Sequence, residues 1–172
     1  MVAAGARADR MHTTETCRDN PDAADCRPPR EFPISAEERI ATFARPEIAA
    51  ELEHAADDHS LPEVRAVFAI APGLVRALNP GSLARLRIPV AILLGDKDAV
   101  APPETNGLAA ARAIPHAEAI RLPGVGHYDF LSPCTAAGRL AVPQCHIDLP
   151  QAGTHAAAAE AAIRFFGAAL KP

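Results

Sequence analysis

The sequence has 172 residues, is 49% hydrophobic and carries a formal net charge of −4 at pH 7, which indicates a globular chain long enough to bury a core. Its arginines are scattered rather than gathered in a basic stripe, so binding to a nucleic acid backbone is not expected. No segment reaches the roughly 18 consecutive apolar residues of a membrane-spanning helix.

Residues 1–62 form the first of two expected regions. Residues 1–10 are small, rich in Ala and mildly helical. Residues 12–33 are polar and rich in Pro, which predicts a long excursion or cap loop rather than a tight connection. A disulfide between Cys17 and Cys26 would staple this loop.

Two helices are expected after the loop. Ser35 followed by Glu38 is a capping-box pattern, which predicts a helix that begins near Ala36. Its inward side is expected to carry Ile40 and Phe43. Pro46 ends that helix and suits the first turn of another. We therefore expect the first region to end in a helical insertion.

Residues 63–172 are expected to form an α/β core with three parallel strands. The strongest strand is Val90–Leu94, which follows Pro89 and is continuously apolar, the pattern of a strand buried on both faces. Val64–Ala71 and Ala119–Leu122 are the other two predicted strands. Helical stretches alternate with them, which is the rhythm of right-handed crossovers.

Three helical segments belong to this core. Residues 74–86 are expected to be helical but broken at Asn79-Pro80-Gly81, and a second helix is expected to run from Pro102 through Ala113. Thr154 is expected to cap the last helix. The buried face of that helix is predicted to consist of apolar residues three or four positions apart: Ala159, Ala162, Ile163, Phe166 and Leu170.

An acid and a histidine follow neighbouring strands of the predicted sheet. All parallel strands end at the same edge, which is where ligands bind in open α/β sheets, so Asp98 and His127 should lie close together there. Asp98 is preferred to Asp96 because Asp96 directly follows the strand, whereas Asp98 reaches further into the loop. A carboxylate that fixes the tautomer of a histidine lets the ring take a proton from a nucleophile and return it to a leaving group. Taken singly, Asp98 has the alternative interpretation of a turn residue that caps the following helix, and His127 that of a satisfied loop histidine.

Two runs of sequence carry a resemblance to a known family. PVAILLGDKDAVAPPETN and AIRLPGVGHYDFL resemble the last third of an α/β-hydrolase, and more narrowly the bacterial dienelactone-hydrolase-like proteins related to platelet-activating-factor acetylhydrolase. The G-x-x-D and G-x-G-H-Y-x-F-L loops match that family's acid and histidine, here Asp98 and His127. The resemblance implies a partial α/β-hydrolase fold that ends with the last three strands, and an esterase with a Ser-His-Asp mechanism that uses no metal or organic cofactor. Its substrate would be a small-molecule ester.

The nucleophile of that mechanism is missing from the sequence. The family places it on a G-x-S-x-G elbow, which does not occur here, and none of the serines (Ser35, Ser60, Ser82, Ser132) lies between a strand and a helix. By the resemblance, MVAAGARAD matches the helix that follows the elbow, so the serine is expected before Met1. The chain alone is then expected to be inactive. The alternative is a non-catalytic α/β interaction module in which residues 12–62 bind a partner.

Four cysteines bear on the compartment. Cys17 and Cys26 lie nine positions apart, Cys134 and Cys145 eleven apart, and neither spacing matches the short C-x2–4-C of zinc sites. Two local disulfides are therefore favoured over free thiols, and the cysteine placement also resembles that of the family. Disulfides imply a periplasmic or secreted protein. The first residues lack the order of a signal peptide, so we expect an export signal upstream.

Three further expectations concern the surroundings of the site. Asp129 is expected to be a local cap rather than a second acid. Cys145, His146 and Asp148 are an alternative metal cluster, which a disulfide at Cys145 would leave short of a ligand. The outer edge of the Val64–Ala71 strand is expected to pair with another chain and cause self-association.

Overall fold

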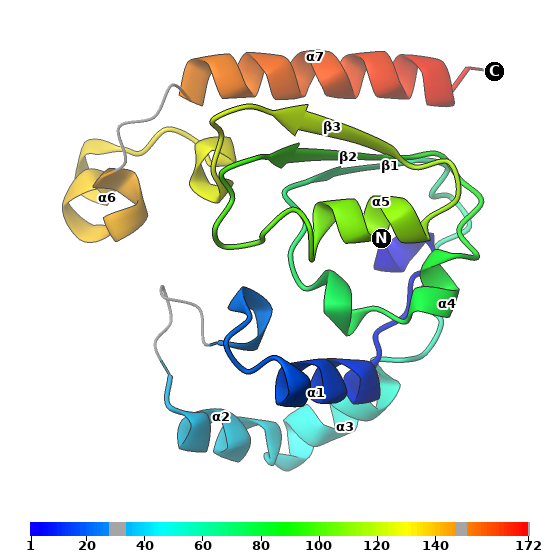
Figure 1. The fold of residues 1–172 in the computed structure, drawn as a ribbon, viewed down its shortest axis with the longest axis vertical. Coiled ribbons are helices and arrows are strands. Elements are labelled where there is room, and N and C mark those ends of the chain that lie inside the picture. The colour runs from blue at the N-terminus through cyan, green and yellow to red at the C-terminus, as the bar shows by residue number, and fades with distance from the viewer. Residues whose placement is uncertain (28–33, 147–150, 172) are drawn as a thin grey trace.

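A three-stranded parallel sheet lies at the centre of the computed structural model, which describes residues 1–27, 34–146 and 151–171. The strands are β1 (Val67–Ile70), β2 (Val90–Gly95) and β3 (Glu118–Leu122), in the order β1-β2-β3 (Figure 1). Helix α7 (Gln151–Ala169) covers one face of the sheet and helix α5 (Gly107–Ala113) covers the other (Figure 1). The predicted α/β class, with parallel strands and flanking helices, is confirmed.

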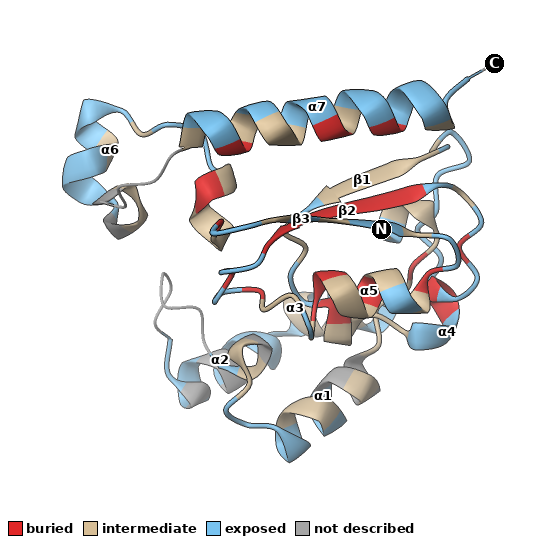
Figure 2. Ribbon diagram, turned by 45° about the horizontal axis from the view of Figure 1, so that its top comes forward, coloured by how far each residue is buried: buried red, intermediate tan, exposed pale blue. Residues whose placement is uncertain are grey.

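Strand β2 is the centre of the core, as its apolar run predicts. Every residue of β2 is buried, and the strand forms a continuous buried band in Figure 2. Ile92 packs with Ala110 and Ile114 of the α5 side in the main hydrophobic cluster. Gly107 lets α5 approach closely, because a Cβ there would lie only 2.8 Å from Cδ2 of Leu94.

Strand β1 is shorter than the predicted Val64–Ala71. The register pairs Val67 with Val90, the first residue of β2, so the residues before Val67 have no part of β2 beside them. The amide of Val67 donates to the carbonyl of Pro89, which turns the backbone groups of the alternate residues, Phe68 and Ile70, away from β2. β1 is therefore an apolar edge of the described sheet.

The remaining helices are short. The α-helices are α1 (Arg10–Asp19), α2 (Ala36–Phe43), α3 (Pro46–His54), α4 (Pro80–Leu83) and α6 (Ala136–Ala141). The 3₁₀ helices are η1 (Val2–Ala4), η2 (Ala24–Cys26), η3 (Val75–Ala77), η4 (His127–Phe130) and η5 (Pro143–His146). The expected break in residues 74–86 is confirmed, because Asn79 caps α4 by accepting the amide of Ser82 at 2.9 Å.

The polar segment predicted as a loop contains helix α1, so that prediction is wrong for residues 12–19. Asp9 starts the helix by accepting the amide of His12 at 2.9 Å. The segment has no apolar stripe, which is why its periodicity gives no helix signal. The rest of the predicted loop contains η2. Its last part, residues 28–33, lies outside the described residues.

The capping box of α2 is confirmed in both directions. The Ser35 amide donates to Oε2 of Glu38 at 2.8 Å, and the Glu38 amide donates to Oγ of Ser35 at 3.0 Å. The predicted inward face is wrong at Phe43, which is 51% exposed. The burial of Ile40 lies outside the described residues. Caps fix where α2 begins, but they do not fix what it packs against.

Two boundaries in the core differ from the expectation. Helix α5 begins at Gly107 rather than Pro102, because residues 102–106 form turns in which the Asn106 amide bonds to the Pro102 carbonyl. Thr154 is buried inside α7 and does not cap it.

The buried face of α7 is also rotated from the predicted one. Phe165 packs on Phe68 with ring centroids 5.8 Å apart, whereas Ile163 is 74% exposed. Alanines surround this helix on almost every side, so its apolar pattern does not select one face.

Both predicted disulfides are formed, Cys17–Cys26 and Cys134–Cys145. The second links the loop before α6 to η5, and α6 projects beyond the sheet at the end where the strands finish (Figure 1). None of the helices within the described ranges is long and apolar enough to cross a membrane.

Candidate active site

The loops after β2 and β3 are joined by three successive contacts. Oδ1 of Asp96 accepts the Gly124 amide at 2.7 Å, and the Lys97 amide donates to the Val125 carbonyl at 2.9 Å. Nδ1 of His127 lies 2.8 Å from Oδ2 of Asp98. The structure therefore brings together the two residues that the sequence placed at one sheet edge.

Gly95, the last residue of β2, allows the two loops to approach. A Cβ at this position would lie 2.1 Å from the carbonyl oxygen of Val125, far closer than real Cβ contacts. Any larger residue would push the second loop away. The sequence marks this glycine only as the end of a strand, and its packing role was missed.

Asp98 is buried and fixed by the backbone of its own loop. Its side chain is 1% exposed, and its Oδ1 accepts the amides of Val100 at 3.0 Å and Ala101 at 2.7 Å. Its Oδ2 is left for His127. Helix α5 begins only at Gly107, so Asp98 orders a turn in its loop and does not cap the helix.

His127 is the first residue of η4, and its side chain is 27% exposed. A carboxylate can only accept, so Nδ1 carries the proton that faces Asp98 and Nε2 is the nitrogen with a free lone pair. The Tyr128 ring packs edge-on at 5.5 Å between centroids. A histidine oriented in this way can accept a proton at Nε2 from a hydroxyl.

Asp129 caps the turn that carries the histidine. Its Oδ2 accepts the Gly126 amide at 2.9 Å, and the residue is 1% exposed. Its Oδ1 is buried with no hydrogen-bond partner. The expected local cap is present, together with an uncompensated buried oxygen that the sequence did not indicate.

The hydroxyls of Ser35 and Ser82 have other contacts. The Ser82 hydroxyl accepts the Arg7 amide at 2.9 Å and donates to the Asn79 carbonyl at 2.7 Å, and Ser35 belongs to the capping box. Across residues 1–27, 34–146 and 151–171, no serine hydroxyl is hydrogen-bonded to His127. The candidate site thus consists of an acid and a base.

Exposed apolar side chains lie at the same edge of the sheet. Ile70 is the last residue of β1 and the other three follow the strands, and their exposed fractions are 45% for Ile70, 63% for Leu74, 41% for Val100 and 49% for Leu131. Leu74 has a left-handed backbone with φ of 55°. The sequence placed Leu74 in a helix, so its position at this edge was missed.

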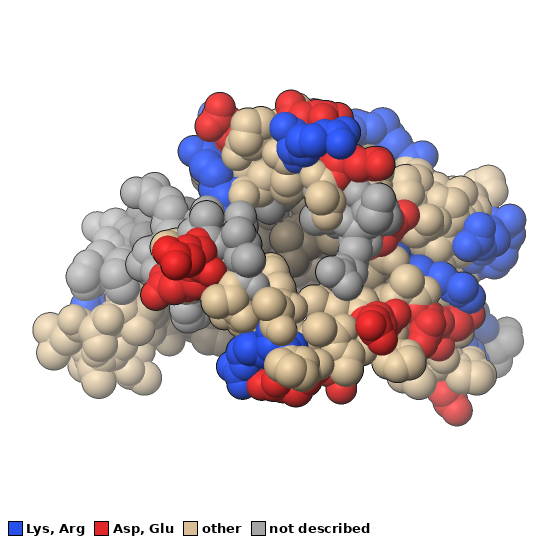
Figure 3. Space-filling model, turned by 90° about the horizontal axis from the view of Figure 1, so that it is seen from below, with Lys and Arg blue, Asp and Glu red and all other residues tan. Residues whose placement is uncertain are grey.

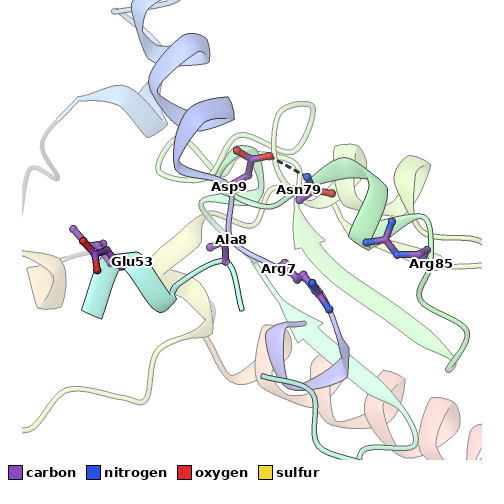
Figure 4. A pocket seen from close by; sticks show the side chains of 8 residues that line it. Arg7, Ala8, Asp9, Glu53, Asn79 and Arg85 are labelled. Carbon is purple, nitrogen blue, oxygen red and sulfur yellow. Dashed lines mark hydrogen bonds between the residues drawn. The ribbon is translucent and has the colours of Figure 1, made fainter. Parts of the chain in front are cut away.

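Other candidate sites receive less support. A pocket of about 490 Å³ lies between the segment before α1, helix α3 and the residues that flank α4, and it is lined among others by Arg7, Glu53, Asn79 and Arg85 (Figure 4). It contains no residue of the two loops. Acidic and basic side chains are interspersed on the face shown in Figure 3, which also has a central hollow. Within the described residues, no group of three or more His, Cys, Asp or Glu could hold a metal ion, and the alternative cluster includes Asp148, which lies outside them.

Comparisons with known proteins give only weak similarities. No family model and no curated protein matches the chain. A predicted CIB-like hydrolase from Thermoplasma acidophilum is 21% identical over 47% of this chain and 36% of that chain, with a TM-score of 0.34. A thermophilic esterase from Thermogutta terrifontis is 24% identical over 70% of this chain and 45% of that chain, with a TM-score of 0.29.

A third solved structure is similar at the same level. The 2-hydroxy-6-oxo-6-phenylhexa-2,4-dienoate hydrolase from Rhodococcus sp. strain RHA1 is 19% identical over 82% of this chain and 50% of that chain, with a TM-score of 0.30. The chain spans half or less of the length of each of these proteins. These similarities concern the fold and carry no conclusion about activity.

Proposed function

We propose that the chain is the C-terminal part of a serine hydrolase that cleaves carboxylic esters, with His127 as its proton-transfer group and Asp98 as the residue that orients it. The observation that carries the proposal is the 2.8 Å contact between Nδ1 of His127 and the buried carboxylate of Asp98. Two backbone amides hold the other oxygen of Asp98, so the carboxylate cannot turn away. The proposal assigns the serine to a G-x-S-x-G elbow outside the present sequence, without which the chain is inactive.

The proposed reaction proceeds through an acyl-enzyme. Nε2 of His127 takes the proton of the serine hydroxyl as its oxygen attacks the ester carbonyl, and Asp98 stabilises the imidazolium that forms. The tetrahedral intermediate collapses, the bond to the alkoxy group breaks, and His127 gives its proton to the departing alcohol. Water then attacks the acyl group with His127 again as base, which releases the acid and restores the serine.

Apolar esters are the substrate class that the surroundings favour. Leu74, Val100 and Leu131 expose apolar surface at the same edge of the sheet as His127. A substrate with an aliphatic or aromatic acyl group would cover that surface, which is favourable in water. The narrower assignment to a dienelactone-hydrolase-like esterase depends on the sequence resemblance.

An oxidising compartment fits the same proposal. Cys17–Cys26 and Cys134–Cys145 are both closed. Disulfides persist in the periplasm and outside the cell and are rare in the cytosol. We therefore place the full-length form in the periplasm or outside the cell. Mass spectrometry without reductant tests this, because four alkylatable thiols would contradict it.

The test of the function uses the chain extended upstream to its first in-frame G-x-S-x-G and short-chain p-nitrophenyl esters. His127→Ala and Asp98→Asn are expected to lower kcat by a factor on the order of 10⁴ or more, because the base is lost in one and held in the wrong tautomer in the other. Asp96→Asn is the matched control. Its side chain bonds to the Gly124 amide at the same edge, is exposed and does not contact His127.

Two results would contradict the proposal. One is turnover that survives His127→Ala in the extended chain. The other is upstream sequence with no serine elbow.

Self-association through the edge strand β1 is a second candidate role, separate from the interaction module in which residues 12–62 would bind a partner. β1 is apolar throughout, and Phe68 and Ile70 turn their backbone groups outward, which is a template for pairing with another chain. The partner that we propose is a second copy of the chain. Sedimentation is expected to show self-association that Ile70→Lys reduces, and a monomer at all concentrations would contradict it.

A further inference from the structure

Two acidic side chains at the candidate site take no part in the mechanism above, and they differ in burial. Asp96 is exposed, whereas Asp129 is 1% exposed. Each accepts one backbone amide from the loop that carries His127, Gly124 at 2.7 Å for Asp96 and Gly126 at 2.9 Å for Asp129. The pair therefore separates the effect of an amide hydrogen bond from the effect of a buried charge.

The carboxylate of Asp129 has fewer hydrogen-bond and ion-pair partners than a buried carboxylate usually has. Its Oδ1 is buried without a hydrogen-bond partner, and no Lys, Arg or His of the described residues forms an ion pair with it. Buried carboxylates are normally paired or hydrogen-bonded at both oxygens, because burial disfavours the charged form. A carboxylate in this state favours the appearance of positive charge nearby.

His127 is the group beside Asp129 that gains positive charge in the proposed reaction. The two residues belong to the same 3₁₀ turn, η4, two positions apart. Gly126, the residue before His127, is held by Oδ2 of Asp129. Val125, the residue before that, is held by the Lys97 amide and by the close approach of Gly95.

We propose that Asp129 is a positioning residue for His127 and that its buried charge, not only its cap, stabilises the imidazolium of the reaction. The inference rests on the proposed function, because only a histidine that accepts a proton benefits from this charge. Asp98 contacts the ring directly. Asp129 acts through the Gly126 backbone and through its field.

The test compares Asp129→Asn with Asp96→Asn in the extended esterase. Asparagine has the shape of aspartate and keeps an oxygen for the Gly126 amide, so the cap stays while the charge is removed. We expect kcat to fall about tenfold with KM unchanged, since removing a charge that stabilises only the transition state lowers kcat. Asp96→Asn is expected to leave kcat within about twofold, because an exposed charge is screened by solvent. Asp129→Ser, a second neutral variant, replaces Asp129→Asn if the latter does not fold.

A second measurement does not depend on turnover. The Nδ1 proton of His127, observed by NMR in the chain itself, is expected to change its chemical shift in Asp129→Asn and to keep it in Asp96→Asn. If the extended wild type shows no esterase activity, the proposed function fails and the role of Asp129 fails with it. If the wild type is active and Asp129→Asn leaves both kcat and the Nδ1 proton unchanged, only the role of Asp129 is overturned.

Two results would overturn the inference. One is a folded Asp129→Asn variant with wild-type kcat and an unchanged Nδ1 proton, which would leave Asp129 as a cap. The other is an equal loss of kcat in Asp129→Asn and Asp96→Asn, which would remove the distinction between a buried and an exposed charge.

Discussion

Residues 64–129 and residues 1–62 are held in place by different kinds of contact. In the first region every residue of β2 is buried, and the loops that follow β2 and β3 touch at backbone distance. In the second, α3 has no buried residue, and an ion pair between Arg7 and Asp58 is about half exposed at both ends. The site is thus built on the region in which steric fit decides. In residues 1–62 the first residues also join the core, since Ala6 is fully buried in it, whereas caps, ion pairs and a disulfide hold the segments that follow.

The largest expected effect comes from Gly95→Ala, which tests steric fit at the site. A Cβ there meets the Val125 carbonyl at 2.1 Å, so the two loops must separate. We expect a loss of about 3 kcal/mol or more in the free energy of unfolding, measured by chemical denaturation, as for other severe overpacking. Gly167→Ala in α7 is the control, because no atom lies within 4 Å of its Cβ position. A Gly95→Ala variant as stable as Gly167→Ala would break the comparison.

Truncating one large apolar side chain in each region should give a smaller, but still clear, difference in the free energy of unfolding. Ile92 in β2 is fully buried, so Ile92→Ala is expected to cost about 2–5 kcal/mol through lost burial and the cavity left behind. Phe43 in α2 is 51% exposed, and Phe43→Ala should cost less than about 1 kcal/mol. Urea denaturation of both variants checks this. Equal losses would mean that α2 is packed as tightly as the sheet.

The smallest expected effect is the dependence on pH of the contacts that Asp58 makes with Ser60 and Arg7. Hydrogen bonds from Ser60, and then from Arg7, lower the pKa of Asp58 from 3.8 to about 2. Because the folded pKa is below the unfolded one, the contribution to stability is present above pH 3.8 and is lost as the pH falls toward 2. The stability difference between the wild type and Asp58→Asn should therefore vanish across that window. A stability difference that does not change with pH would contradict the lowered pKa of Asp58.

The same contrast decides how much could be predicted from the sequence. β2 was predictable because a continuous apolar run has few other interpretations, and Asp98 and His127 because parallel strands end at one edge. The capping box of α2 was predictable because Ser35 and Glu38 interact locally. These signals are either strongly apolar or confined to a few neighbouring residues.

The errors arise where the sequence pattern is weak or the contact is distant. Helix α1 has no apolar stripe and begins at a cap, Asp9, that stands in no capping box. The buried face of α7 depends on Phe165 meeting Phe68 across the sheet, which alanine periodicity does not specify. Gly95 packs against Val125, thirty positions away, and Asp129 bonds to Gly126, three positions away. Only the folded backbone shows which atoms these residues meet.

The three contacts between the loops after β2 and β3 also restrict how the protein can change in length. Asp96 meets Gly124, Lys97 meets Val125 and Asp98 meets His127. The contacts follow the same order along both loops, so the length of one loop is matched to the length of the other. One residue inserted into either loop would offset every later contact and point the carboxylate away from the ring. Related proteins that keep this acid and histidine should therefore show matched insertions or deletions in both loops, or none in either.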